Sequence, residues 1–193
     1  MRGTRPLESN EIEEILKAIK GPTAVRQKAI FVTGLKSGLR ISCILSLQVD
    51  DIWDGKAMRG RIRIRRSTTK GKRSGYDMPL HPEAAAALHA QIKTLQDTRP
   101  GAFVFPRQDG KAPLHRVQAW KSFKRVLTKA GLEGARGELG WHATRKTYAR
   151  KVYEALGHDL IRTAYALRHS CVSTTIRYLS FNEADVDQII LGL

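Results

Sequence analysis

The spacing of the apolar residues constrains the fold of this chain more than any other feature. These residues recur at helical intervals over most of the sequence, and only residues 58–80 follow another period. There, Ile62 and Ile64 alternate with arginines, which is typical of a half-buried strand with one basic face. Residues 76–80 are expected to form the returning strand. The sequence therefore predicts an α+β fold that is mostly helical, a single domain with a small antiparallel sheet.

Helix start and stop signals divide the remainder of the chain. Asn10 is expected to cap the first helix, because Glu13 follows three positions later. Gly38 breaks the next helix, so Arg40 lies at a helix start just after a glycine turn. Further helices are expected over residues 24–35, 39–47, 82–95, 114–130, 142–156, 159–167 and 172–179.

Helical periodicity also predicts which residues face the core. In the helix over residues 114–130, we expect Val117, Trp120, Phe123 and Leu127 to point inward. In the last helix the apolar residues at 172, 176 and 179 cluster on one side, and Tyr178 points away from them. Tyr178 is therefore a candidate for function and not only a core aromatic residue.

The charge of the chain indicates a polyanionic partner. The 193 residues include 34 Lys and Arg against 18 Asp and Glu, a formal net charge of +16. Such a charge favours a polyanion as the partner, although solubility or attraction to a membrane surface could also explain it. No apolar run is long enough to span a membrane, and the first residues lack the apolar core of a signal peptide. We expect a cytoplasmic protein, associated with the nucleoid if it is prokaryotic.

Cysteine spacing provides no sign of a metal site. Cys43 and Cys171 lie far apart and form neither a CxxC nor a Cys/His pattern. We expect two reduced thiols, no metal and no cofactor.

The basic residues cluster around the expected hairpin. Between Arg59 and Arg73 there are eight basic residues and no acidic one. Lys70 is expected at or near the tip of the turn between the two strands. The candidate DNA-binding residues are Arg61, Arg63, Arg65, Lys72, Arg73, Lys146 and Arg168.

Several side chains suit phosphodiester cleavage without a metal. That reaction needs a nucleophile, cations around the pentacoordinate phosphorus, and an acid for the leaving oxygen. A phenol can attack when neighbouring cations stabilise its anion, and arginine can donate two parallel hydrogen bonds to phosphate oxygens. The candidates are Tyr178 as nucleophile, Lys70 as acid, and Arg40, Arg145, His142 and His169 around the phosphate.

Taken in order, these residues resemble the boxes of the tyrosine recombinases, or phage integrases. Residues 37–42 (Ser-Gly-Leu-Arg-Ile-Ser) look like the first box, and residues 69–72 with the Met-Pro-Leu at 78–80 look like the hairpin lysine and its strand. Residues 142–145 match the His-x-x-Arg box. The segment from Leu167 to Tyr178 resembles the sequence that closes the active site of the family.

The resemblance implies a catalytic domain that cleaves and rejoins DNA at specific sites. Tyr178 would attack the phosphodiester to give a 3′-phosphotyrosyl link and a free 5′-hydroxyl, with Lys70 as general acid and the arginines and histidines around the phosphate. Because the link conserves the bond energy, neither ATP nor a metal would be needed. A topoisomerase of the type IB kind and a non-catalytic DNA-binding protein that keeps the fold are the alternatives.

Three positions depart from the family pattern. Cys43 replaces an acidic residue after the first arginine, Arg168 replaces the glycine before His169, and Lys146 replaces a histidine. Cys43 implies that Arg40 must be oriented by other groups, and Arg168 adds charge and bulk beside the phosphate.

The resemblance also predicts a domain plan. We expect the catalytic domain to span residues 1–179, with no N-terminal core-binding domain, because only residues 1–36 precede the first box. Residues 180–193 are acidic and carry an apolar face, as in a helix that docks onto a partner. We expect this tail to dock on a neighbouring protomer in a synaptic tetramer, or else on its own domain.

Overall fold

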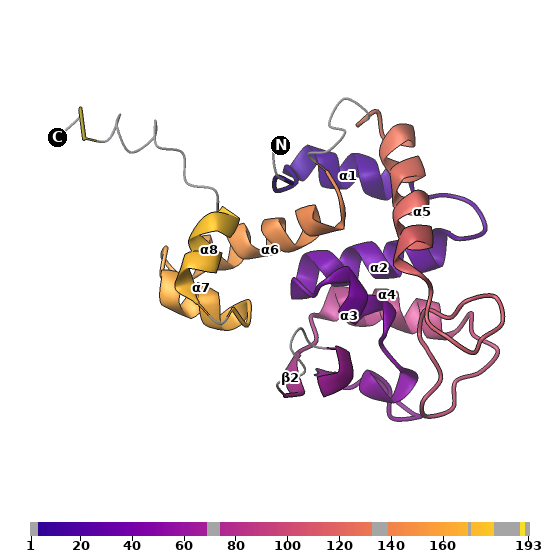
Figure 1. Ribbon diagram of the computed structural model, residues 1–193. Coiled ribbons are helices and arrows are strands. Elements are labelled where there is room, and N and C mark those ends of the chain that lie inside the picture. Colours follow the sequence, from indigo (N-terminus) through magenta and orange to yellow (C-terminus); the bar gives the residue numbers. More distant parts are fainter. Residues whose placement is uncertain (1–3, 69–73, 133–138, 170, 180–189, 192–193) are drawn as a thin grey trace.

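The fold is built around a central helix, α2 (Ala24–Ser37), which packs against α4 (Pro82–Ile92) and α6 (Trp141–Ala155) (Figure 1). The computed structural model describes residues 4–68, 74–132, 139–169, 171–179 and 190–191. Within these ranges most of the regular structure is helical, and one two-stranded sheet is present. The predicted α+β class is confirmed.

The remaining helices surround this centre. Helices α7 and α8 pack on each other and on α6, at the end of α6 that lies away from α1 and α5 (Figure 1). Their bounds are α1 Ser9–Ala18, α3 Ile41–Leu45, α5 Arg116–Lys129, α7 Leu160–Ala166 and α8 Val172–Leu179, with 3₁₀ turns η1 Val49–Asp51 and η2 Arg66–Thr68.

The period-2 segment forms the predicted hairpin. Strand β1 (Arg61–Ile64) pairs antiparallel with β2 (Tyr76–Pro79), and Ile64 lies opposite Tyr76. Ile62 and Ile64 are buried, whereas Arg61 and Arg63, which alternate with them, are exposed, as the sequence pattern predicted. The expected turn with Lys70, Lys72 and Arg73 lies outside the described residues.

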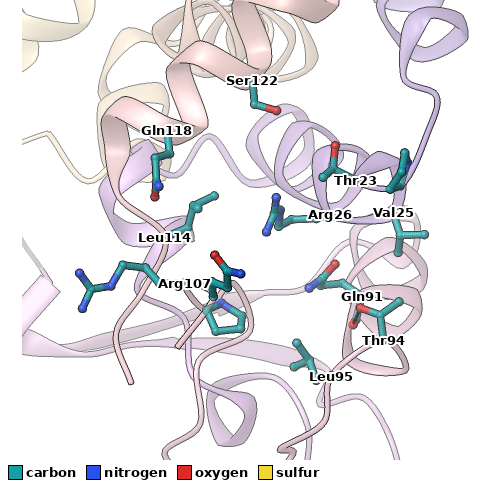
Figure 2. A pocket seen from close by; sticks show the side chains of 13 residues that line it. Thr23, Val25, Arg26, Gln91, Thr94, Leu95, Arg107, Leu114, Gln118 and Ser122 are labelled. Atoms are coloured by element: carbon teal, nitrogen blue, oxygen red, sulfur yellow. Dashed lines mark hydrogen bonds between the residues drawn. The ribbon is translucent and has the colours of Figure 1, made fainter. Parts of the chain in front are cut away.

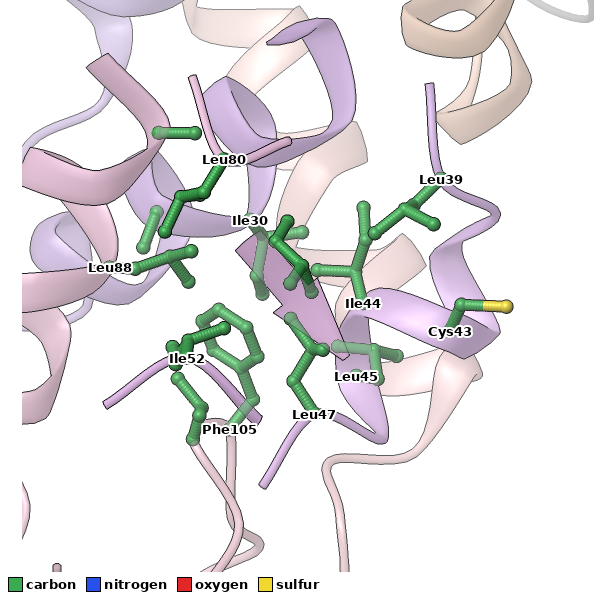
Figure 3. Packing of buried hydrophobic residues seen from close by; sticks show 14 of the residues in the cluster. Ile30, Leu39, Cys43, Ile44, Leu45, Leu47, Ile52, Leu80, Leu88 and Phe105 are labelled. Carbon is green, nitrogen blue, oxygen red and sulfur yellow. The ribbon is translucent and has the colours of Figure 1, made fainter. Parts of the chain in front are cut away.

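One hydrophobic core fixes the start of α3. Leu39 and Ile44, on either side of Arg40, are buried with Ile30 of α2, Leu88 of α4 and Phe105 (Figure 3). Burying side chains of this size contributes roughly 1.5–3 kcal/mol each. The backbone at the first box is therefore held from both sides.

A second core holds the start of α6. The ring of Trp141 stacks on Phe123 of α5 with centroids 4.3 Å apart, and Phe123 also contacts Phe31 of α2. The first residue of α6 is thereby packed against α5. This packing sets the rotation of α6 and so the direction in which the side chains of His142 and Arg145 point.

Two local predictions were wrong. Asn10 does not cap α1: the cap is Glu8, whose N–H donates to the Glu11 carboxylate at 2.9 Å, and Arg5 pairs with that carboxylate. On α5, Val117 and Trp120 are 47% and 38% exposed.

The buried stripe of α5 instead runs through Ala119, Phe123, Val126 and Leu127. The periodicity argument gave no weight to Ala119, a small residue that is buried in the same core cluster as Ile44 and Leu45 of α3. No helix among the described residues has the length and apolarity that crossing a bilayer requires.

Candidate active site

Arg40 is presented by the turn between α2 and α3. Gly38 ends α2 in the left-handed conformation (φ 61°), and its N–H donates to Gly34 O. Arg40 is the N-cap of α3, and its carbonyl accepts the N–H groups of Cys43 and Ile44. Its half-buried guanidinium makes no hydrogen bond or ion pair within the part of the chain that the structure describes.

Arg145 is a buried cation held by backbone carbonyls. It lies on α6 and is 5% exposed. Its Nη1 donates to Gly38 O and its Nη2 to Leu167 O at 2.7 Å, while Nε has no partner among the described groups. No described carboxylate pairs with it. Burial, and then the charge of Arg40, lower the pKa of Arg145.

His169 is held in a defined tautomer between Arg145 and α8. Its Nε2 is 3.1 Å from Arg145 Nη2, and its Nδ1 is 2.8 Å from Thr175 Oγ1. Because a guanidinium can only donate, Nε2 accepts, and the proton therefore resides on Nδ1 and is donated to Thr175. Burial, followed by the charges of Arg145 and Arg40, lowers the pKa of His169 to about 4, so the ring is neutral at pH 7.

Tyr178 faces His142 across the same site. Its hydroxyl is 3.3 Å from His142 Nδ1, and its ring centroid is 5.0 Å from that of His169. Although His142 is exposed at its edge, partial burial and then the nearby Arg145, Arg40 and Lys146 lower its pKa. A neutral His142 can accept the phenolic proton, and the Arg145 guanidinium, 5.7 Å from the ring centroid, can stabilise the anion that remains.

Tyr178 reaches this position by a packing that the periodicity argument missed. Ile176, which was predicted on the apolar face of α8, is 43% exposed, whereas Thr175 is fully buried. A polar contact, Thr175 to His169, thus fixes the rotation of α8, and this turns Tyr178 towards His142. Thr175 lies in the segment from Leu167 to Tyr178 that resembles the family, yet the sequence assigned it no role. The backbone carbonyls of Gly38 and Leu167 had no signal in the sequence.

The structure thus brings residues from the first, the His-x-x-Arg and the last sequence boxes together. A family model described as the phage integrase family matches residues 5–184. The chain belongs to the phage integrase family. This family comprises the tyrosine recombinases, and the recognition made from the sequence is confirmed.

Relatives and solved structures cover this integrase domain to different extents. The probable integrase/recombinase YoeC of Bacillus subtilis (strain 168) is 28% identical over 185 residues, 95% of this chain and 93% of that protein. The tyrosine recombinase XerD of Lacticaseibacillus casei is 29% identical over 81% of this chain but 51% of that protein. A crystal structure of the XerH site-specific recombinase bound to palindromic difH substrate has the same fold, with TM-score 0.73 and 22% identity over 98% of this chain and 53% of that one. The chain thus spans about half the length of the Xer proteins it matches.

Cys43 leaves the integrase site without a negative charge at this position. The residue is 6% exposed, and burial raises the pKa of its thiol even though Arg40 and Arg145 are near. A neutral thiol cannot balance either arginine, so the cationic character of the site is stronger than it would be with the usual acidic residue.

Arg168 occupies a backbone conformation that suits glycine. It follows α7 with φ 53°; His169 N–H donates to Ala164 O and Arg168 N–H to Tyr165 O, the pattern of a Schellman motif. A left-handed non-glycine residue costs about 1–2 kcal/mol. The guanidinium lies 5.0 Å from the Tyr76 ring and 4.9 Å from the Tyr165 ring, and each exposed cation–π contact contributes roughly 0.5–1 kcal/mol. The strain and the stacking therefore nearly offset each other.

The hairpin arginines differ in how far they are available to DNA. Arg65 is engaged in ion pairs with Asp51 at 2.8 Å and Asp50 at 2.7 Å, which anchor β1 to η1. Arg61 donates to Asp77 O, and Arg63 lies 3.9 Å from Asp50. The Nζ of Lys146, by contrast, lies over the Tyr178 ring, 6.0 Å from its centroid. A DNA-binding role for these residues and for Arg168 stays a prediction.

Two adjoining cavities lie away from the reactive side chains. One of about 630 Å³ lies between the start of α2, the end of α4 and α5, with Arg26 and Gln118 among its lining residues (Figure 2). The second, of about 400 Å³, shares Arg26. The basic residues that line it are Lys20, Arg26, Lys121, Arg125 and Lys129, and no acidic residue is found among the described lining residues.

Substitution of Gly38 by alanine is expected to destabilise the domain. A Cβ there would lie 2.9 Å from two ring atoms of Tyr148 and closer to a third, in addition to the left-handed strain. Strain of about 1–2 kcal/mol and overpacking of about 1–3 kcal/mol predict a loss of roughly 2–5 kcal/mol in the free energy of unfolding, measured with urea. Gly131→Ala is the control, because φ is 72° but nothing lies within 4 Å of its Cβ. Equal losses in the two variants would contradict the role assigned to Tyr148.

Proposed function

We propose that this domain is a site-specific DNA recombinase that cleaves and rejoins double-stranded DNA through a covalent link to Tyr178. The observation that carries the proposal is the buried Arg145, a cation without a carboxylate partner among the described residues, beside the hydroxyl of Tyr178 and two neutral histidines. Burying an unpaired charge is unfavourable, and a bound phosphate would compensate it.

The proposed reaction balances protons without a metal or ATP. The Tyr178 hydroxyl passes its proton to His142 Nδ1, its oxygen bonds to phosphorus, and the bond from phosphorus to the 5′-oxygen breaks. Arg145 and Arg40 stabilise the charge on the non-bridging oxygens, and His169, whose Nε2 accepts from Arg145 Nη2, holds that guanidinium in place. Lys70, outside the described residues, is proposed to protonate the leaving 5′-oxygen. The reverse steps, with a new 5′-hydroxyl as attacker, release Tyr178.

We further propose double-stranded DNA as the partner of this domain, which would act in the cytoplasm. Residues 1–179 would form the catalytic domain, and residues 180–193 would dock on a neighbouring protomer to assemble a synaptic tetramer. The net charge of +16 and the basic face of α5 support binding through phosphates.

The direct test is to trap the covalent complex. Nicked suicide DNA substrates lose the 5′-hydroxyl strand after cleavage, so an active protein accumulates as an adduct that resists denaturant. Candidate sites come from DNA selected by binding, and mass spectrometry of the adduct should assign the link to Tyr178. Relaxation of plasmid DNA without a specific site would favour a topoisomerase. DNA binding with no adduct on the selected site would leave a non-catalytic binding protein and reject the proposal.

The basic surface of α5, formed by Lys121, Arg125 and Lys129, is expected to contribute contacts to DNA phosphates. Lys121→Ala combined with Arg125→Ala should weaken binding to all DNA sequences and reduce the slope of log K against log salt by about 2. Lys17→Ala is the matched control, because Lys17 already pairs with Glu14 at 2.8 Å. Titrations at several salt concentrations measure the slope. An unchanged slope in the double variant would exclude this surface from the interface.

A further inference from the structure

We propose that Arg168 is a positioning residue for the cleavage site. Its guanidinium carbon lies 5.0 Å from the ring centroid of Tyr76, on β2, and 4.9 Å from that of Tyr165, on α7. The stack therefore joins the end of α7 to the hairpin, across elements that are far apart in sequence. This inference rests on the proposed function.

The residues on either side of Arg168 in the chain both form hydrogen bonds with Arg145. Leu167 O accepts from Arg145 Nη2 at 2.7 Å, and His169 Nε2 lies 3.1 Å from the same nitrogen. The backbone angle at Arg168 sets the relative position of these two groups. Holding the side chain of Arg168 thus holds both contacts to the buried arginine.

The same stack acts on the hairpin. Tyr76 pairs with Ile64 in the sheet, and its ring borders a cavity of about 360 Å³ that Arg145, Tyr165 and Arg168 also line. Lys70, the proposed general acid, lies in sequence between β1 and β2, outside the described residues. A fixed distance between β2 and α7 therefore holds the hairpin in a constant position relative to Arg145 and His169.

This role differs from the direct DNA contact that the sequence suggested for Arg168. Its guanidinium carbon lies over two aromatic rings, and an ammonium cannot reproduce the stacking of a planar guanidinium on such rings. If Arg168 were a phosphate ligand, its charge would be essential for DNA binding and the Tyr165 ring would not matter. In a positioning residue the stack is essential, and loss of either partner should have the same effect.

The test uses variants of the exposed partners. Arg168→Gly suits the left-handed backbone and removes the stack, Arg168→Lys keeps the charge, and Tyr165→Leu removes one ring that is 72% exposed. Ile161→Ala, on the same helix and 73% exposed, is the control. Each protein is examined by single-turnover adduct formation, by DNA titrations at several salt concentrations and by NMR titration of the His169 ring.

We expect the three variants to slow adduct formation roughly tenfold, because small displacements of positioned groups have effects of this order. Arg168→Gly combined with Tyr165→Leu should be no slower than Arg168→Gly alone, since Arg168→Gly already removes the contact with Tyr165. The affinity for DNA and its salt dependence should stay at wild-type values.

The NMR titration examines the proposal without DNA. The pKa of His169, about 4, should rise towards its ordinary value in the variants as its burial beside Arg145 is relaxed. The other groups that face this ring, Arg40, Thr175 and Tyr178, are unchanged.

Two results would overturn the inference. One is a weaker, less salt-dependent affinity in Arg168→Gly with no effect of Tyr165→Leu, which would make Arg168 a phosphate ligand. The other is an unchanged His169 titration in every variant. If the wild-type protein forms no adduct at all, the proposed function fails, and the NMR titration alone still decides whether Arg168 positions His169.

Discussion

Tyr178→Phe is expected to bind DNA like the wild-type protein and to form no covalent adduct. The substitution removes only the hydroxyl, whose described contact is His142 Nδ1 at 3.3 Å, so the free energy of unfolding should change by no more than about 1 kcal/mol. The ring remains beside His169, and the arginines keep their places. The expected loss therefore reflects the missing nucleophile and not a misfolded site.

Gel analysis on suicide substrates measures the loss of adduct, and a variant of a second tyrosine is the control. Tyr165→Phe keeps its ring against Arg168 and should give a normal adduct yield. Residual adduct in Tyr178→Phe would show that another residue attacks.

The pH dependence of the wild-type rate follows from the same pair of residues. Because the pKa of His142 is lowered, its neutral, proton-accepting form persists below the usual titration range of histidine. Adduct formation should be constant around pH 7 and decline only at a pH below the ordinary titration range of histidine.

Arg145→Ala is expected to slow single-turnover cleavage by roughly 10³-fold, since removal of one preorganised donor to a developing oxyanion has effects of about 10²–10³. Arg145→Lys should be nearly as slow, because an ammonium cannot satisfy two carbonyls and a phosphate with planar donors. Arg150→Ala is the control: it lies on the same helix and is exposed, with ion pairs to Glu8 and Glu154.

Stability distinguishes a catalytic loss at Arg145 from a structural one. The alanine variant removes an unpaired buried charge, which favours folding, but leaves the carbonyls of Gly38 and Leu167 unpaired at about 1–3 kcal/mol each. Urea unfolding should therefore show a modest loss at 25 °C, with the domain still folded. A rate within tenfold of wild type in this variant would show that Arg145 is not the main phosphate ligand.

Local sequence patterns predicted the elements of the fold but not how several of them are rotated. The alternation around Ile62 identified the hairpin, and Asp159 caps α7 as expected, its carboxylate accepting the N–H of Arg162. These features depend on neighbours within a few residues. The predicted faces of α5 and α8 were wrong in part: Phe123 and Leu127 are buried as expected, but Val117, Trp120 and Ile176 are exposed. Ala119 and Thr175 face inward in place of these larger apolar residues.

The sequence by itself determined the family, the order of the boxes and the chemical types that could attack and bind a phosphodiester, because these follow from residue identity and spacing. Only the tertiary structure decided the charge states of the site. Arg145 became a buried cation because Gly38 and Leu167, from different parts of the chain, present carbonyls to it. His169 is neutral because it is partly buried and because the nearby arginines act on it through space. No local sequence pattern encodes either effect.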